Sequence, residues 1–342
     1  MLYNHASGET GRSALVLWGG MRLIRGLHNL DPALRGCAAT IGNFDGVHLG
    51  HQAVLGQLAE RAAELCLPTT VILFEPQPQE YFTPEQAPPR LTRFREKLVA
   101  LRRFSVDRVL CLRFDRQLAA LPADDFIRHV LVDGLGVRYL VVGDDFRFGK
   151  GRTGDFDLLV RAGRRADFPV ANMHSFELGG ARVSSTRIRE ALGAGDLQAA
   201  AQMLGRPYRM LGRVAHGDKR GRTIGFPTAN LFLHRRSTPV QGVFAVELYG
   251  LDTEPLYGVA NVGTRPTVDG TRSLLEVHLL DFSGDIYGRQ VAVDFVRKLR
   301  PEKRFGSFAE LKAQIEQDAE QARAFFRERN FNHEGHKGHE GI

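Results

Sequence analysis

Cysteine is scarce in this sequence of 342 residues. The chain has three cysteines, Cys37, Cys66 and Cys111, which are widely spaced and include no CxxC pair. An odd number at such spacing argues against a disulfide framework and against a zinc site built on paired thiolates. We therefore expect reduced, buried thiols in a cytoplasmic protein.

Long apolar runs are also absent. No stretch approaches the roughly 18 residues of a membrane span, and the early run "SALVLWGG" is too short for a signal sequence and lacks a cleavage site. We expect no membrane partner. Because "MRLIRGLHNL" from Met21 resembles a natural beginning, we predict that residues 1–20 are an extension or alternative start outside the fold.

Acidic residues are too few to balance the basic ones. The net charge is +7 and the isoelectric point is about 9.5, so anionic partners are expected. Charge alone does not distinguish nucleic acid from nucleotides and phosphorylated metabolites. The length favours two domains.

The first domain is expected over residues 21–205. From residue 37, short apolar runs alternate with amphipathic helical segments at 52–65, 94–104, 124–133 and 155–165. The strand-like runs are "CAATIG", "TTVILFE", "RVLCLRF", "YLVVGDD" and "FPVANMHSF". This alternation predicts right-handed crossovers and a parallel α/β sheet with helices on both faces.

The second domain is expected over residues 206–330. After "LGRPY" at 204–208, strand-like runs follow one another with only turns between them, and Leu275, Val277 and Leu279 alternate with other residues. Such runs predict a small antiparallel β-barrel, closed by a helix that Ser307 caps. We expect residues 331–342 to be a disordered tail, although His333, His336 and His339 are spaced to hold a metal.

The stretch "GNFDGVHLGHQ" at 42–52 predicts a nucleotide site. It reads as a glycine-rich turn between a strand and a helix, with His48 and His51 on one side of the first helical turn. That end of a helix attracts phosphate, and two imidazoles add donors. A zinc pair and ordinary capping residues remain alternatives. The other candidate nucleotide-binding residues here are Gly42, Asn43, Asp45, Gly46 and Gly50.

Two later stretches add candidates in the first domain. "RVSSTRIRE" offers Ser185, Thr186 and Arg189 to a nucleotide, and an ordinary capped helix is the alternative. Gly149, Gly151 and Gly154 spell GxGxxG, but "DDFRF" precedes them, so we interpret a phosphate- or flavin-contacting loop and not a dinucleotide fingerprint. Candidate flavin- or phosphate-binding residues are Asp144, Asp145, Arg152 and Arg182, whereas Phe146 and Phe148 are expected in the core.

The stretch "GDKRGRTIGFPTANL" at 217–231 predicts a second phosphate site. It lacks P-loop spacing. In an extended chain Thr228 and Asn230 point to one face and offer oxygen ligands that suit Mg²⁺; an ordinary strand entry is the alternative. Glu276 lies between apolar neighbours, where a carboxylate is costly unless it is paired or functional. An exposed edge-strand face is the alternative for Glu276.

These motifs together resemble one family. "HLGH" resembles the HxGH signature of the nucleotidyltransferase superfamily, shared with class I aminoacyl-tRNA synthetases. From about residue 21 to 327 the motifs resemble, in order, those of bacterial bifunctional riboflavin kinase/FAD synthetases, including "VGDDFRFGKGRTGD", "GFPTANL", "GVFAV", "GVANVGTRPT" and "LLEVHLLDF". The resemblance implies a nucleotidyltransferase-like domain followed by a kinase barrel.

The resemblance also implies roles. Thr228 and Asn230 would hold Mg–ATP, Glu276 would be the base for the ribityl 5′-hydroxyl, and Lys219 and Arg222 would contact phosphates. The implied partners are ATP, riboflavin, FMN and FAD, with Mg²⁺ as cofactor and without nucleic acid. The oligomeric state stays open.

Two other functions are kept as alternatives. One is a nucleic-acid-binding protein with a synthetase-like module, against which stand the missing KMSKS-like loop and the lack of an aromatic ladder in the barrel. The other is an enzyme in which only one half is active.

Overall fold

The chain forms two compact units that interleave along the sequence. The computed structural model describes residues 15–18, 20–173, 175–215, 228–233, 235–267 and 270–337. The first unit comprises Met1–Ala87 and Lys97–Glu177, and the second comprises Pro88–Glu96 and Leu178–Ile342. Residues 88–96 and 178–205, which the sequence analysis places in the first domain, therefore group by their contacts with the barrel.

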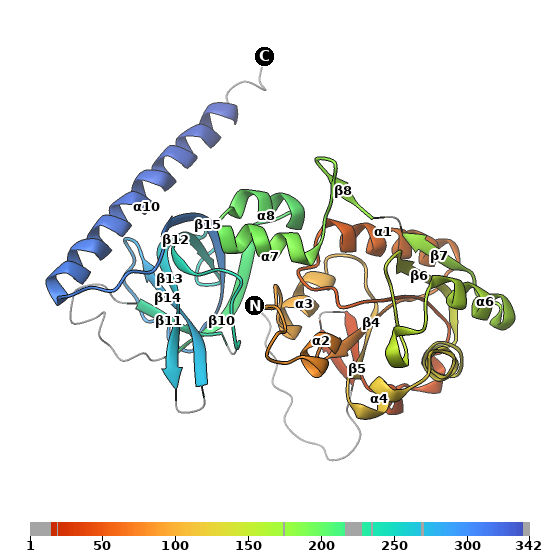
Figure 1. Cartoon of the computed structure of the whole chain (residues 1–342). Coiled ribbons are helices and arrows are strands. Elements are labelled where there is room, and N and C mark those ends of the chain that lie inside the picture. The colour runs from red at the N-terminus through yellow and green to blue at the C-terminus, as the bar shows by residue number, and fades with distance from the viewer. Residues whose placement is uncertain are drawn as a thin grey trace, which may run out of the picture. The chain divides into compact units, whose positions relative to one another are not determined.

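A seven-stranded sheet forms the centre of the first unit, in the order β1-β2-β5-β4-β3-β6-β7 (Figure 1). The strands are β1 (Leu15–Trp18), β2 (Met21–Arg25), β3 (Cys37–Ile41), β4 (Thr69–Glu75), β5 (Arg108–Arg113), β6 (Val137–Gly143) and β7 (Val170–Met173). The pairs from β2 to β7 are parallel, as predicted. The expectation that residues 1–20 lie outside the fold is wrong for Leu15–Trp18, because β1 pairs antiparallel with β2 and extends the sheet.

Helices cover both faces of this sheet. On one face α1 (Leu49–Glu64) packs Val54 and Leu58 against Ala38 and Val141. On the other face the α5 helix (Ala123–Phe126), the π-helical segment η3 (Ile127–Leu135) and α6 (Phe156–Ala166) bury residues against β3, β5 and β6. The predicted single helix at 124–133 is thus an α-turn that continues as a π-helix.

Shorter elements connect these strands and helices. They are η1 (Leu27–Asn29), η2 (Pro32–Leu34), α2 (Pro78–Phe82), α3 (Phe94–Leu101), α4 (Arg116–Ala120), η4 (Lys150–Arg152) and the two-stranded hairpin of β8 (Glu177–Leu178) and β9 (Ala181–Arg182). The division between the two units falls inside α3, between Glu96 and Lys97. That helix therefore contributes residues to both units.

A closed six-stranded barrel forms the second unit, in the order β10-β11-β14-β13-β12-β15 (Figure 1). Its strands are β10 (Tyr208–Ala215), β11 (Thr228–Phe232), β12 (Gly242–Tyr249), β13 (Leu256–Thr267), β14 (Gly270–Leu279) and β15 (Gln290–Arg300). All of the pairings are antiparallel, as predicted. The interior is filled by fully buried side chains such as Leu231, Phe244, Leu275 and Val277.

Besides the start of α3, three helices of the second unit lie within the residues that the structure describes. They are α7 (Ser185–Ala194), α8 (Leu197–Leu204) and α10 (Phe308–Lys337). The Ser307 hydroxyl accepts a hydrogen bond from the Glu310 N–H at 3.2 Å, which confirms the predicted cap of α10. The helix continues to Lys337, so the expectation of a disordered tail from residue 331 is wrong for its first seven residues. His339 lies outside the described residues.

Candidate active sites

The first candidate site lies at the carboxyl ends of β3 and β6. From β3 the chain proceeds through β4 and β5 on one side, and then returns to place β6 on the other side of β3. Open parallel sheets bind ligands at such a switch point, at the carboxyl ends of the strands. The loop from Gly42 to His48 follows β3 there, and Asp144 and Asp145 follow β6.

The backbone between β3 and α1 is strained. Phe44, Gly46 and Val47 have φ values of 47°, 87° and 45°. A β-branched residue with positive φ is an outlier, and such strain is held by surrounding packing and gathers at functional sites. Here Phe44 and Val47 are buried, and so is Asp45 between them. Burial of these side chains thus holds the loop in one conformation, and this loop leads directly into α1.

His48 caps α1, and His51 stacks on it. The His48 Nδ1 accepts a hydrogen bond from the His51 N–H at 3.4 Å, so a neutral His48 carries its proton on Nε2. The two rings stack with centroids 3.7 Å apart, and the Phe44 ring lies 4.9 Å from His51. The two histidines are therefore brought together as predicted, and His48 has a capping role, which was one of the alternatives.

His51 is held neutral by its surroundings. Burial, the neighbouring His48 and the positive charge of Lys97 together lower the pKa of His51 well below its usual 6.5. The His51 Nδ1 is buried and has no hydrogen-bond partner among the described residues. A neutral imidazole with an unsatisfied buried atom is poised to pair with a ligand.

The sequence analysis missed Lys97. This residue follows Glu96 in α3 and is 1% exposed, and its charge acts on His51. A fully buried lysine is uncommon unless it is paired, so Lys97 is a candidate functional residue. In the sequence, "RFREKL" is indistinguishable from a solvated helix face, so no local signal identifies this residue.

An exposed aromatic group lies at the same edge of the sheet. Tyr81 and Phe82 in α2, which follows β4, are 38% and 62% exposed. Their rings lie 5.5 and 5.6 Å from that of Phe114, which follows β5. Solvated aromatic faces offer stacking surface to a flat ring. The sequence analysis did not single out these residues.

The acidic and glycine-rich loop after β6 is exposed at its polar residues. Asp144, Asp145 and Arg152 are exposed, and Asp144 accepts a hydrogen bond from the Ser175 hydroxyl at 2.9 Å. Phe148 is buried, and Phe146 stacks on it with centroids 5.5 Å apart, as predicted for core residues. Gly149 caps the short 3-10 helix η4, Gly151 lies within it, and Gly154 precedes the start of α6 by two residues. The glycines thus lie in the connection between β6 and α6, and the first of them comes six residues after β6 ends.

The second nucleotide motif belongs to the second unit. Ser184 caps α7, so Ser185 and Thr186 occupy its first two positions. The Arg189 Nε donates to the Pro89 carbonyl at 2.7 Å, and Arg187 donates to the Arg182 carbonyl at 2.6 Å. Arg187 therefore holds nearby backbone, whereas Arg189 holds the backbone of a segment 100 positions earlier in the chain. Arg182 itself is exposed.

The barrel brings the second set of candidates onto one face. In β11, Thr228 and Asn230 are half-buried, whereas Ala229 and Leu231 point into the interior. Asn230 lies directly opposite Glu276 of β14, and Thr228 lies opposite His278. Paired residues of adjacent strands share a face, so Thr228, Asn230 and Glu276 form one polar patch.

The patch contains residues that the sequence analysis missed. Glu276 also lies opposite Asn261 of β13, and the exposed Phe232 follows on the same face of β11. Only the strand register reveals this proximity. Lys219 and Arg222 lie outside the described residues.

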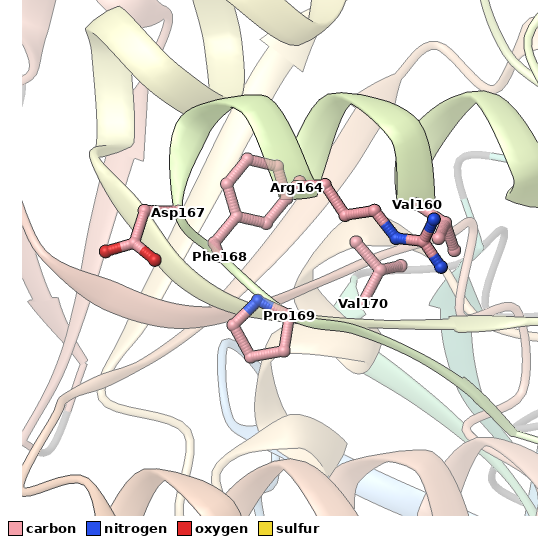
Figure 2. A pocket seen from close by; sticks show the side chains of 7 residues that line it. Val160, Arg164, Asp167, Phe168, Pro169 and Val170 are labelled. Carbon is pink, nitrogen blue, oxygen red and sulfur yellow. The ribbon is translucent and has the colours of Figure 1, made fainter.

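Figure 2 shows a pocket of another kind in the first unit. It lies where α6 ends and β7 begins, at the amino end of the strand, and is lined by Val160, Gly163, Arg164, Asp167, Phe168, Pro169 and Val170. This edge is opposite to the one that bears His48. The pocket therefore does not belong to the first candidate site.

Two observations concern metals and membranes. The described residues include no group of three His, Cys, Asp or Glu side chains placed to hold a metal ion, so the alternative of a zinc pair at His48 and His51 gains no support. In the described part of the chain, no helix has both the length and the apolar character that crossing a membrane requires.

Comparisons with known proteins connect these sites to two activities. Residues 30–187 match the family model of FAD synthetase, and residues 204–326 match that of riboflavin kinase. The chain is 56% identical over 307 residues to the bifunctional riboflavin kinase/FMN adenylyltransferase of Escherichia coli K12, covering 90% of this chain and 98% of that protein.

Other relatives agree. The Haemophilus influenzae protein of the same name is 55% identical over 306 residues, which cover 90% of this chain and 99% of that protein. A Streptococcus pneumoniae crystal structure, titled as a macrolide-efflux protein, is 30% identical with a TM-score of 0.74, covering 88% of this chain and 98% of that one. The alternatives kept above are not favoured. The chain belongs to the bifunctional riboflavin kinase/FMN adenylyltransferase family, which makes FMN from riboflavin and FAD from FMN with ATP as co-substrate.

Proposed function

We propose that the loop from Gly42 to His48 and the start of α1 bind the phosphates of ATP for adenylyl transfer. The observation that carries this assignment is the orientation of His48, whose Nδ1 accepts the His51 N–H. Its Nε2–H can therefore donate to a phosphate oxygen, beside the N–H groups that the first helical turn leaves unsatisfied. Asn43, Asp45 and Gly50 belong to the same loop and turn.

In this step a phosphate oxygen of FMN attacks the α-phosphorus of ATP. The bond from that phosphorus to the bridging oxygen breaks, and pyrophosphate leaves with the electron pair. Negative charge grows on the leaving oxygens, where neutral imidazole and backbone N–H donors stabilise it. The charge of Lys97 acts in the same direction by its proximity to His51.

The flavin of the same step is proposed to lie against the exposed rings of Tyr81 and Phe82. These rings belong to the first unit and follow β4 at its carboxyl end. The carboxylates of Asp144 and Asp145 can accept hydrogen bonds from flavin hydroxyl or N–H groups, and Arg152 can pair with phosphate. Arg182, Ser185, Thr186 and Arg189 stay predicted ligand contacts.

Riboflavin phosphorylation is proposed for the polar patch of the barrel. Glu276 accepts the proton of the 5′-hydroxyl as that oxygen attacks the γ-phosphorus of ATP, and ADP leaves. The Thr228 hydroxyl and the Asn230 amide oxygen are hard ligands on one face, so they fit Mg²⁺ that also binds phosphate. When bound, that ion neutralises charge on the phosphates.

The test replaces Glu276 with Gln and follows the two steps separately. Removal of a general base costs on the order of 10²-fold or more, so riboflavin-to-FMN conversion should fall by that amount while FMN-to-FAD conversion stays unchanged. Asp281→Asn is the matched control, because Asp281 is engaged by Arg323 at 3.0 Å. A Glu276→Gln protein within a few-fold of the parent rate would show that the carboxylate is structural.

Two further expectations belong to this proposal. The protein should act on nucleotides without binding nucleic acid, and a steeply salt-dependent affinity for RNA would contradict that. A cytoplasmic location stays a prediction from the cysteines, which are all free thiols in the structure.

A further inference from the structure

Three polar side chains lie in one row across three neighbouring strands of the barrel. Asn230 of β11 is directly opposite Glu276 of β14, and Glu276 is directly opposite Asn261 of β13. The next row toward the carboxyl end of β11 consists of Leu231, Leu275 and Val262, which are all 0% exposed in the barrel interior. Because side chains alternate along a strand, the polar row lies on the outer face.

Asparagine is an uncommon choice in the middle of a strand. It lacks the branched or aromatic shape that packs well on a sheet. Both of the strands that flank Glu276 nevertheless place an asparagine opposite it, among valines, alanines and leucines. Such a local departure from strand preference is expected at functional positions.

The side chain of Asn261 is half-buried, and its amide makes no hydrogen bond within the described ranges of the chain. The other asparagine of the row differs, since the Asn230 Nδ2 lies 3.5 Å from the Thr228 carbonyl. Directly opposed residues have Cβ atoms about 4.5–5.5 Å apart. That separation lets the amide group of Asn261 reach the carboxylate of Glu276.

We infer that Asn261 is a positioning residue for riboflavin phosphorylation, whose amide N–H donates to one carboxylate oxygen of Glu276. The other oxygen then faces the 5′-hydroxyl. The two asparagines beside the carboxylate therefore have different roles: Asn261 orients Glu276, whereas Asn230 presents its amide oxygen to the cation of Mg–ATP. This inference rests on the role proposed above for Glu276.

A positioning role predicts a particular kinetic pattern. Asn261→Ala should lower kcat for riboflavin phosphorylation by about tenfold, because it removes one contact that is coupled to the base. The KM for riboflavin should stay unchanged. FMN adenylylation should be unaffected. Asn261→Val, which favours a strand, should give the same result and separates the effect from poor folding. Gln290→Ala, an amide on β15 outside the patch, is the matched control.

A double-mutant cycle gives the decisive readout. If Asn261 acts through the carboxylate, Asn261→Ala should have no further effect in a Glu276→Gln background. Additive losses, an unchanged kcat in both Asn261 variants, or a raised KM with unchanged kcat would each overturn the inference. A parent-like rate in Glu276→Gln alone would instead overturn the proposed base, so the two failures are distinguishable.

Discussion

At the scale of single residues, the first site depends on a tautomer and on a pKa. Since a backbone N–H can only donate, its bond to the His48 Nδ1 determines which nitrogen of that ring faces a ligand as a donor. His51 is neutral because burial, His48 and Lys97 all disfavour its charged form. The two imidazoles therefore differ in their contacts, since His48 caps α1 and His51 stacks on it.

Replacing both histidines with alanine should abolish most FAD formation. Loss of one positioned donor to a transition-state oxygen costs about 100-fold or more, whereas riboflavin phosphorylation should stay near normal. The measurement is the rate of FMN adenylylation next to that of FMN production. His129→Ala, at an exposed position, is the control. An equal loss of both activities would point to a folding role.

The pKa of His51 predicts how stability depends on pH. Because the folded state lowers this pKa below the ordinary 6.5, the unfolded chain binds a proton more readily as the pH falls through that value. Stability is therefore expected to decrease below about pH 6.5. Between pH 7 and pH 5, the thermal midpoint of the His51→Gln variant should fall less than that of the parent protein. A parallel fall in both proteins would contradict the assignment.

Sequence patterns singled out the two histidines, Glu276, Thr228 and Asn230 as candidates, because each of these lies in a local motif. They did not identify Lys97 or Asn261, whose significance arises from neighbours distant in sequence. Nor did they predict the positive φ of Val47. That conformation is held by burial of the side chain and not by the preference of valine.

At the scale of helices and strands, hydrophobic periodicity was a reliable guide. Each of the predicted apolar runs is a strand, and α1, α3 and α6 lie where helical spacing placed them. The wrong predictions concern segments whose secondary structure depends on contacts with another element. Strand β1 forms because β2 offers a partner edge, and η3 widens to a π-helix while burying four side chains.

Glycines in two helices should respond in opposite ways to alanine. A Cβ at Gly163 of α6 would lie 2.3 Å from the Phe168 carbonyl oxygen, whereas a Cβ at Gly56 of α1 meets no atom within 4 Å. Gly163→Ala is expected to destabilise the first unit by about 1–3 kcal/mol. Gly56→Ala should stabilise it by about 0.5–1 kcal/mol. Urea unfolding measures both, and shifts of the same sign would contradict the packing.

At the scale of the whole molecule, the domain boundary predicted after residue 205 differs from the division that the contacts show, because residues 88–96 group with the second unit. The buried Arg235 pairs with Glu96 and donates to the Arg90 carbonyl at 2.7 Å. Glu96 also accepts from the Leu211 N–H at 2.9 Å. The barrel thus depends on Glu96, whose contacts with Leu211 and Arg235 span 115 and 139 positions.

In a fragment of residues 206–330, Arg235 should therefore lower the free energy of unfolding, because its guanidinium is left without its partner. Removing one partner of a buried ion pair costs about 3–5 kcal/mol, and the fragment lacks Glu96. Arg235→Met should raise its stability in urea, whereas Arg300→Met should lower it, because Asp318, the partner of Arg300, is retained. A fragment that Arg235→Met does not stabilise would contradict this role, and riboflavin phosphorylation reports whether it folds.

The Glu96–Arg235 pair also sets an order of events during synthesis. The two residues are separated by 139 positions, so at about 5–20 residues per second a ribosome needs roughly 7–28 s to make the arginine after the glutamate. Throughout that interval the Glu96 carboxylate lacks Arg235, and the contact that it can make within its own segment is the one with the Arg93 N–H. The strands of the first sheet are complete by Met173, and the first barrel strand begins at Tyr208, so the sheet can form before any barrel strand is synthesised. Because the two units interleave along the chain, a single cut in the gene cannot leave both of them whole.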